Sequence, residues 1–141
     1  MRETGMSGSR REARGLALQA LYEWDSVHHD PDKAINRAFE ENTPADIDYT
    51  RTIVQNVVDN VRNLDRTIQH FAQAFPVPQI ALIDKNILRI AFSELIFCHD
   101  VPHKVVANEA VEIAKDYGGP NSSKFINGVL GSYLDKALAI K

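Results

Sequence analysis

The sequence predicts an all-helical domain, and three observations lead to that prediction. Apolar residues recur at intervals of three or four, which is the period of an α-helix. Stretches of strand-like alternation bounded by turn dipeptides are absent. The chain has 141 residues, of which 44% are hydrophobic and 25% charged, the balance of one soluble globular domain with a single core.

The first helix is predicted to begin near Ser9, because Ser9 and Glu12 have the spacing of a capping box. An apolar stripe at helical spacing follows: Leu16, Ala17, Ala20, Leu21 and Trp24. We therefore expect residues 1–8 to be a flexible N-terminal arm and residues 9–141 to form the domain.

Two later dipeptides, Asp30-Pro31 and Thr43-Pro44, each combine a capping residue with a proline suited to the first helical turn. They predict the starts of the second and third helices.

The clearest helical face follows these starts. Its members are Ile53, Val57, Val61, Leu64, Ile68, Phe71 and Phe75. We expect a break near residues 63–65, where Asp65 could cap a new helix, and an end at Pro76.

The stretch from Gln79 to about Phe97 is apolar on several sides, which is typical of a central, buried helix. Pro102 is predicted to start the next helix and Gly118-Gly119-Pro120 to stop it, with glycine in a left-handed cap. Asn121 or Ser122 is then expected to cap the last helix.

Gly128 and Gly131 lie within this last helix, where glycine destabilises. We expect them to permit the close approach of another helix.

The charge is unevenly distributed along the chain. The net charge is -3, which argues against a general nucleic-acid coat protein. Four arginines lie within the first fourteen residues against two glutamates, so a basic tip precedes an acidic body. The tip could contact a polyanion locally or could be ordinary solvated surface.

Several classes of protein are disfavoured by simple patterns. No apolar run is long enough for a membrane span or a secretory signal. Cys98 is the only cysteine, so it forms neither an internal disulfide nor a cysteine-built zinc site. We expect a cytoplasmic protein without a cofactor.

Catalytic and metal-binding patterns are equally weak. The five histidines form no recognised ligand motif such as H-E-x-x-H, so no metal site is predicted. Glu94 and Glu109 lie within apolar stretches and are interpreted as structural acids, hydrogen-bonded where helices meet. No catalytic residue is predicted, and the chain is not expected to be an enzyme.

Two helix starts carry features that a purely structural interpretation leaves unexplained. Arg10 and Arg11 would lie in a first helical turn, where basic side chains are disfavoured unless they bind an anion. Asn121, Lys124 and Phe125 begin the last helix, just after Lys115. If these two starts lie side by side, they form a basic groove with an aromatic side chain, which suits single-stranded RNA.

Four sequence runs occur in order along almost the whole chain. They are R-R-E-A-R-G-L-A-L-Q-A-L-Y (residues 10–22), I-D-K-N-I-L-R-I-A-F-S-E-L (83–95), D-V-P-H-K-V-V-A-N-E-A-V-E-I-A-K-D-Y-G (100–118) and S-S-K-F-I-N-G-V-L (122–130). Together they resemble the NusB family of bacterial transcription antitermination factors. The resemblance is weakest between residues 25 and 50.

This resemblance implies about seven helices in two packed subdomains, forming a single NusB-like RNA-binding domain. It also implies binding of boxA-type single-stranded RNA jointly with NusE, a small-subunit ribosomal protein. The resulting complex would help RNA polymerase read through terminators in ribosomal RNA operons.

The resemblance also carries residue roles. RNA contacts would come from Arg10, Arg11, Arg14 and Gln19, and from Asn121, Lys124 and Phe125, beside the Lys115 identified above. NusE would contact Asp84 and, more weakly, Tyr22. The family often has an arginine where this chain has Glu12, which implies weaker RNA binding without NusE.

Two other interpretations stay open. The same fold resembles the RNA-binding domain of certain rRNA cytosine methyltransferases, but those proteins continue into a catalytic domain that this chain is not expected to have. Alternatively, the chain is a protein-interaction or homodimerisation module, in which case the basic tip is dispensable.

Overall fold

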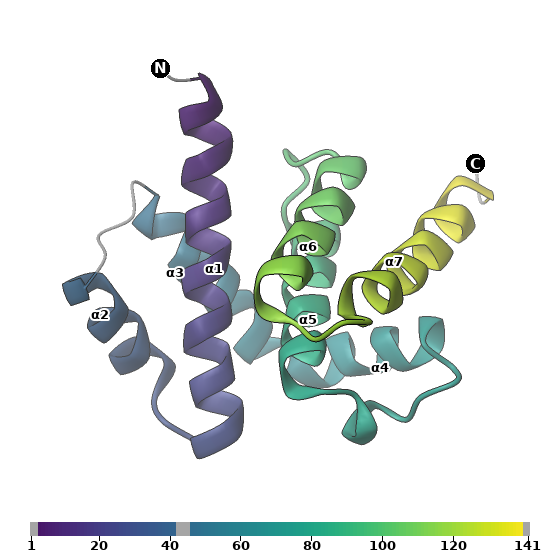
Figure 1. Ribbon diagram of the computed structural model, residues 1–141, viewed down its shortest axis with the longest axis horizontal. Coiled ribbons are helices and arrows are strands. Elements are labelled where there is room, and N and C mark those ends of the chain that lie inside the picture. Colours follow the sequence, from purple (N-terminus) through teal and green to yellow (C-terminus); the bar gives the residue numbers. More distant parts are fainter. Residues whose placement is uncertain (1–2, 42–45, 140–141) are drawn as a thin grey trace.

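The computed structural model describes the backbone of residues 3–41 and 46–139, and the side chains of residues 9–37 and 46–137. Over these residues the chain forms seven α-helices and one short 3-10 helix, in agreement with the predicted all-helical fold (Figure 1). The elements are α1 (Glu3–Val27), α2 (Pro31–Glu41), α3 (Ile47–Asp59), α4 (Val61–Phe71), η1 (Val77–Gln79), α5 (Leu82–Phe97), α6 (His103–Tyr117) and α7 (Ser122–Ala139).

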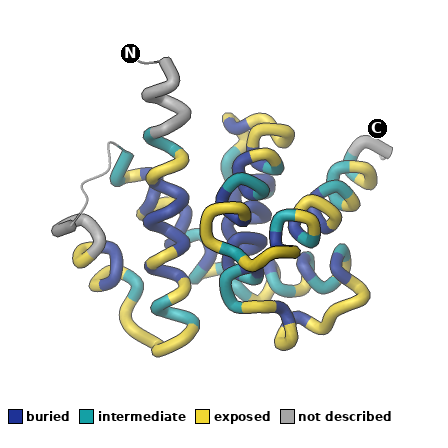
Figure 2. The backbone as a smooth tube through the Cα atoms, viewed as in Figure 1, coloured by how far each residue is buried: buried dark blue, intermediate teal, exposed yellow. Residues whose placement is uncertain are grey.

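The helices form two groups that share one core. Helices α1, α2 and α3 pack together on one side, and α4, α6 and α7 surround the other side of α5 (Figure 1). Both α1 and α3 also contact α5, so α5 joins the two groups. Its buried apolar residues include Ile87, Leu88, Ala91, Phe92 and Leu95 (Figure 2). The prediction of a central, buried helix is therefore confirmed.

A buried arginine fastens the two groups to each other. Arg89 of α5 donates to Asp65 of α4 at 2.8 Å through both Nε and Nη2, and to Asp25 of α1 at 2.9 Å. Asn86, one turn earlier in α5, also donates to Asp25 at 3.1 Å. Three helices thus meet at one network of satisfied polar groups.

Helix α1 begins earlier than its capping pattern predicts. It starts at Glu3, so Ser9 lies inside the helix and cannot serve as its N-cap. Arg10 and Arg11 consequently lie well past the first turn, and the expected conflict with the positive end of the helix dipole does not arise. The apolar stripe is confirmed, because Leu16, Ala17, Ala20 and Leu21 are buried and Trp24 packs partly buried against the core. The flexibility of residues 1–8 stays a prediction.

The starts of α2 and α3 are both marked by aspartate side chains. The Asp30 side chain accepts from the Asp32 backbone N–H at 3.0 Å, as its predicted capping role requires. The N-cap of α3 is instead Asp46, whose carboxylate accepts from the backbone N–H of Tyr49 at 3.3 Å. The predicted start at Thr43-Pro44 lies outside the described residues.

The long apolar segment breaks at Asn60 rather than at residues 63–65. Asn60 ends α3 and precedes α4, and its side chain donates to the Asn56 carbonyl at 2.8 Å. Asp65 caps no helix but accepts from Arg89. Helix α4 ends at Phe71, so Phe75 lies beyond it and is 49% exposed instead of sharing the apolar face.

The boundaries of α6 and α7 are confirmed, but the glycines act differently from the prediction. Gly118 ends α6 with a φ of -92°, so no left-handed cap forms. A Cβ at Gly118 would instead lie 2.5 Å from the Ser122 side chain and 2.8 Å from the Ala114 carbonyl oxygen. Glycine is therefore required here for close packing. Among the described residues, no atom of another helix lies within 4 Å of a Cβ built at Gly128 or Gly131, so this part of the chain does not make the expected close helix approach there.

Candidate functional site

Arg10 and Arg11 are held against the body of the protein by acidic and aromatic side chains. The Arg10 guanidinium lies 4.0 Å from the centre of the Tyr49 ring, and 3.6 Å from both Asp46 and Asp100. Arg11 donates from Nε and Nη2 to the two oxygens of Glu109 in α6, at 2.9 and 2.7 Å.

These contacts orient the arginines without hiding them. The Arg11 side chain is 48% exposed and that of Arg10 35% exposed. A guanidinium has five N–H donors, so the two bonds to Glu109 leave the outer donors of Arg11 available to a phosphate. The hydrogen bond and charge of Arg11 lower the pKa of Glu109 although burial raises it, so the acid stays ionised and keeps Arg11 in place.

Arg14 has a different environment from its two neighbours. Its side chain is only 3% exposed, and its Nε and Nη2 atoms donate to the Glu94 carboxylate at 2.8 to 3.0 Å. The hydroxyl of Tyr49 donates to the same carboxylate at 2.5 Å. Burial, with the Glu94 charge adding to it, raises the pKa of Tyr49 above its ordinary value and keeps the hydroxyl protonated.

The burial of Arg14 changes its role. An RNA phosphate cannot reach a guanidinium that is enclosed between α1, α3 and α5, so we assign Arg14 to the fold and not to an RNA-binding surface. Glu94 and Glu109 are both hydrogen-bonded acids at helix contacts, as the sequence predicted.

The structure does not join the two predicted helix starts into one groove. Arg11 contacts the middle of α6 through Glu109, whereas the start of α7 follows the far end of α6. Tyr117, at that end of α6, packs against Gly15 of α1. Its hydroxyl oxygen would lie 3.3 Å from a Cβ placed at Gly15. Tyr117 thus lies on α1 between the arginines and the start of α7.

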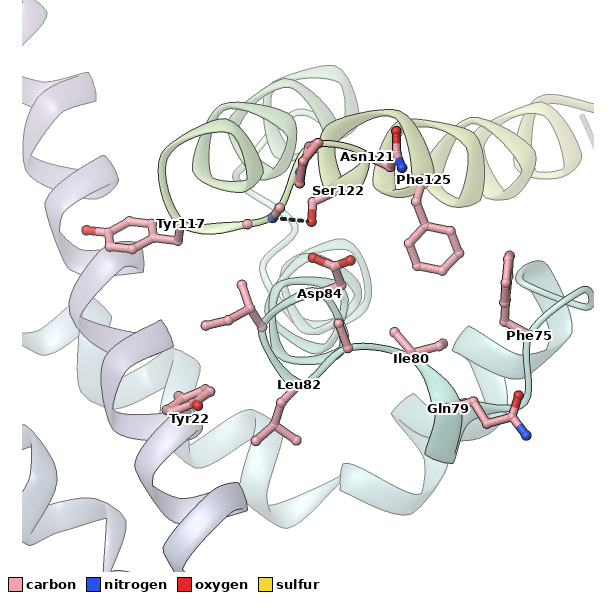
Figure 3. Close-up of a pocket in the computed structure, with 15 residues that line it drawn as sticks. Tyr22, Phe75, Gln79, Ile80, Leu82, Asp84, Tyr117, Asn121, Ser122 and Phe125 are labelled. Carbon is pink, nitrogen blue, oxygen red and sulfur yellow. Dashed lines mark hydrogen bonds between the residues drawn. The ribbon is translucent and has the colours of Figure 1, made fainter.

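A pocket of about 540 Å³ is present at the start of α7 (Figure 3). We name it the aromatic pocket, because Tyr22, Phe75, Tyr117 and Phe125 line it. The other lining residues are Gln79, Ile80, Ala81, Leu82, Ile83, Asp84, Gly118, Gly119, Pro120, Asn121 and Ser122. It brings together Asn121 and Phe125, predicted to contact RNA, with Tyr22 and Asp84, predicted to contact a protein.

Asp84 is the polar centre of this pocket. It lies in the first turn of α5, where the helix dipole favours a negative charge. The residue is 9% exposed, and its buried Oδ1 atom has no hydrogen-bond partner among the described residues. A carboxylate with unused acceptor capacity at the edge of a pocket favours a ligand that donates a hydrogen bond or carries positive charge.

The loop before α7 forms the opposite wall. The backbone N–H of Gly119 donates to the Ser122 hydroxyl at 2.8 Å (Figure 3). The backbone N–H of Phe125 donates to the Asn121 carbonyl at 3.0 Å. Asn121 therefore stands just before α7, and Ser122 is buried. These bonds hold the loop in a fixed shape against α5.

The remaining predicted residues lie around this pocket and along α1. Gln19 is exposed and lines a second hollow of about 470 Å³, which shares Tyr22, Ile83 and Tyr117 with the aromatic pocket. Lys124 is exposed and forms no ion pair within the described part of the chain. Lys115 is exposed but donates to Glu112 at 3.1 Å.

Sequence reasoning missed two aromatic residues of the pocket. Phe75 was assigned to a helical face and Tyr117 was given no role in binding, yet they are 49% and 47% exposed. The signal for Phe75 was its neighbour Pro76, which places it outside a helix.

Two further classes of site receive no support from the described residues. Among them, no group of three or more potential ligands is placed to hold a metal ion. No helix in the same part of the chain has the length and apolar character needed to cross a membrane.

Comparison with known proteins identifies relatives of the whole chain. Residues 11–135 match the model of the NusB family. The chain is 46% identical over 136 residues to the transcription antitermination protein NusB of Dehalococcoides mccartyi (strain CBDB1), covering 95% of this chain and 94% of that protein. It is 41% identical over 135 residues to the NusB protein of Roseiflexus sp. (strain RS-1), covering 93% and 95%.

Solved structures agree with these sequence relatives. A crystal structure of the antitermination factors NusB and NusE in complex with double-stranded RNA contains a chain with a TM-score of 0.82 and 25% identity, covering 91% of this chain and 97% of that chain. NusB of T. maritima has a TM-score of 0.79 and 30% identity, with coverage of 86% and 87%. The family match, the curated relatives and the shared fold agree, and the chain belongs to the NusB family of transcription antitermination proteins.

Proposed function

We propose that this protein binds boxA-type single-stranded RNA together with NusE, and so promotes processive transcription of ribosomal RNA operons by RNA polymerase. The observation that carries the proposal is the aromatic pocket. Residues that the family resemblance assigns to RNA, Asn121 and Phe125, share it with Asp84, which the resemblance assigns to NusE. One surface can therefore bring both ligands into contact with each other. The proposed role belongs to the cytoplasm and is binding rather than catalysis.

The RNA part of the interface extends from this pocket along α1. Arg10, Arg11 and Lys124 offer exposed positive charge, and Phe125 offers a ring for stacking. If these three cations each neutralise one phosphate, the logarithm of affinity for a single strand falls with the logarithm of salt with a slope of about -2. Binding of RNA by this protein alone should therefore be weak, and NusE should strengthen it.

The NusE part of the interface centres on Asp84. We expect a lysine or arginine side chain of the partner protein to pair with the Asp84 carboxylate at the pocket, whose apolar walls would exclude water from that contact. Tyr22, which is 42% exposed at the same pocket, extends the contact onto α1.

The proposal is tested by fluorescence anisotropy with a labelled boxA-like RNA. A scrambled single strand and a duplex of the same sequence serve as competitors, because a structurally similar complex contains double-stranded RNA. Each titration is run with and without NusE at two salt concentrations. The expected result is selective binding of the boxA-like single strand that tightens when NusE is present.

Two variants separate the two halves of the interface. Phe125→Ala should weaken RNA binding, while Asp84→Asn should weaken NusE binding by at least about 10-fold, because the amide removes the negative charge that attracts the partner's cation. Equal affinity for boxA-like and scrambled RNA, or no effect of NusE, would contradict the proposal. Binding of NusE with no RNA contribution would instead favour a protein-interaction module.

A further inference from the structure

Phe75 is an exposed aromatic residue in a segment that is firmly held. It lies between α4 and η1, and 49% of its surface is exposed. Its exposure here forgoes much of the stabilisation that burying a phenylalanine side chain would give. The core therefore does not explain why a phenylalanine occupies this position.

The backbone around Phe75 is fixed by hydrogen bonds from both sides. The Gln69 side chain donates to the Phe75 carbonyl at 3.1 Å, and its oxygen accepts from the Val77 backbone N–H at 2.9 Å. The Phe75 backbone N–H donates to the Ala72 carbonyl at 3.0 Å. Pro76, which follows directly, restricts the backbone further. The backbone at Phe75 is thus fixed, so less conformational entropy is lost when its ring binds a ligand.

The Phe75 ring faces Phe125 across one end of the aromatic pocket (Figure 3). The two ring centres are 5.5 Å apart, and the ring planes are at 89° to each other. Phe125 belongs to the first turn of α7, directly after the exposed Lys124. Lys124 does not line the pocket, so the corner between the two rings offers ring surfaces only, and stacking on such rings is how proteins hold the bases of single-stranded nucleic acid.

We propose that Phe75 is an RNA-contacting residue, and that Phe75 and Phe125 together hold one unpaired nucleobase in the aromatic pocket. This inference deepens the proposed function and rests on it. It adds a third segment, the connection between α4 and η1, to an RNA surface otherwise assigned to α1 and α7. A base stacked in this corner would lie in the same pocket as Asp84, the residue proposed to contact NusE. The RNA and the protein partner would therefore be close to each other.

The test compares Phe75→Ala with a matched control, Phe97→Ala. Phe97 is 41% exposed and ends α5, at the opposite end of that helix from the pocket. Affinity for the boxA-like strand is measured by anisotropy in the presence of NusE, and NusE binding is also measured without RNA. From the usual effect of removing a stacked ring, Phe75→Ala should weaken RNA binding about 5- to 100-fold, whereas Phe97→Ala should not. Phe75→Trp should retain binding.

A second series locates the base. Single abasic sites are introduced along the RNA, and each is titrated with wild type and with Phe75→Ala. One position should weaken binding to wild type yet have little further effect in the variant, because both changes remove the same contact. The salt dependence should be the same in both proteins, since no charge has changed.

The outcomes distinguish this inference from the proposed function. If wild type binds no RNA with NusE present, both are overturned. If wild type binds RNA and Phe75→Ala binds it equally well, only the role of Phe75 is overturned. If Phe75→Ala weakens NusE binding in the absence of RNA, Phe75 contacts the protein partner and the nucleobase assignment is wrong.

Discussion

At the scale of single residues, Arg10, Arg11 and Arg14 are neighbours in one helix but have three different environments. Arg14 is buried against Glu94. Arg11 is half exposed and donates to Glu109, and Arg10 lies over the ring of Tyr49. Side-chain direction around α1 determines these differences, because positions one apart point about 100° away from each other. Composition alone therefore cannot indicate which arginine is available to a ligand.

Glu109 provides a test of the contact that orients Arg11. Glu109→Gln should lower the free energy of unfolding at pH 7 by about 1–2 kcal/mol, because it removes a two-bond ion pair whose arginine is half exposed. The folded-state pKa of Glu109 lies below 4.5, since Arg11 stabilises the charged form. The stabilisation is therefore present above about pH 4.5 and is lost as pH falls through the folded-state pKa. Urea unfolding of wild type and variant between pH 3 and 7 measures this difference.

Glu112→Gln is the matched control for this experiment. Glu112 is 45% exposed and pairs with Lys115 on the same helix, so its removal should change stability by less than about 0.5 kcal/mol. A Glu109→Gln variant as stable as the Glu112→Gln variant at pH 7 would show that the contact with Arg11 contributes nothing.

At the scale of helices, prolines and glycines predicted the boundaries well. Pro31, Pro102 and Gly118 lie at or next to helix ends, because each restricts or breaks the backbone locally. The predicted position of the break between α3 and α4 was wrong. Neither proline nor glycine marks Asn60, and its side-chain hydrogen bond is made to the preceding helical turn. The face containing Phe75 was extended too far, because periodicity continued for one turn after the helix had ended.

The two glycines of α7 give a prediction at this scale. Gly128→Ala and Gly131→Ala should each stabilise the protein, by up to about 1 kcal/mol, because alanine favours the helix and no neighbouring atom would obstruct the added Cβ. Thermal unfolding of each variant measures the gain. Destabilisation would contradict the open space seen at these positions, and a stabilised variant with impaired NusE or RNA binding would indicate that a partner uses this face.

At the scale of the whole molecule, the aromatic pocket is assembled from distant parts of the chain. Its aromatic residues come from α1, the connection after α4, the end of α6 and the start of α7. The sequence supplied Tyr22, Asp84, Asn121 and Phe125 through the family resemblance, but not their shared location. That location depends on how α5 packs between the two groups of helices, which local patterns do not determine.

Arg89 should contribute strongly to the packing of the two groups of helices around α5. Arg89→Met should lower the free energy of unfolding by about 2–3 kcal/mol, because it leaves Asp25 and Asp65 without their shared cation while both stay partly hydrated. Urea denaturation followed by circular dichroism measures the loss. Arg62→Met, at an exposed position of α4 with no ion pair among the described residues, is the control and should change stability little. Equal stabilities for the two variants would contradict a fastening role for Arg89.

The same junction also gives the protein an optical property. Trp24 is the only tryptophan, and its indole lies partly buried, with the Arg89 guanidinium 5.9 Å from the ring centre. Ultraviolet-excited emission at tryptophan wavelengths therefore originates from a single place, where α1 meets α5. The aromatic pocket contains tyrosine and phenylalanine but no tryptophan. The emission wavelength of Trp24 therefore reports on separation of the two groups of helices, without an attached dye.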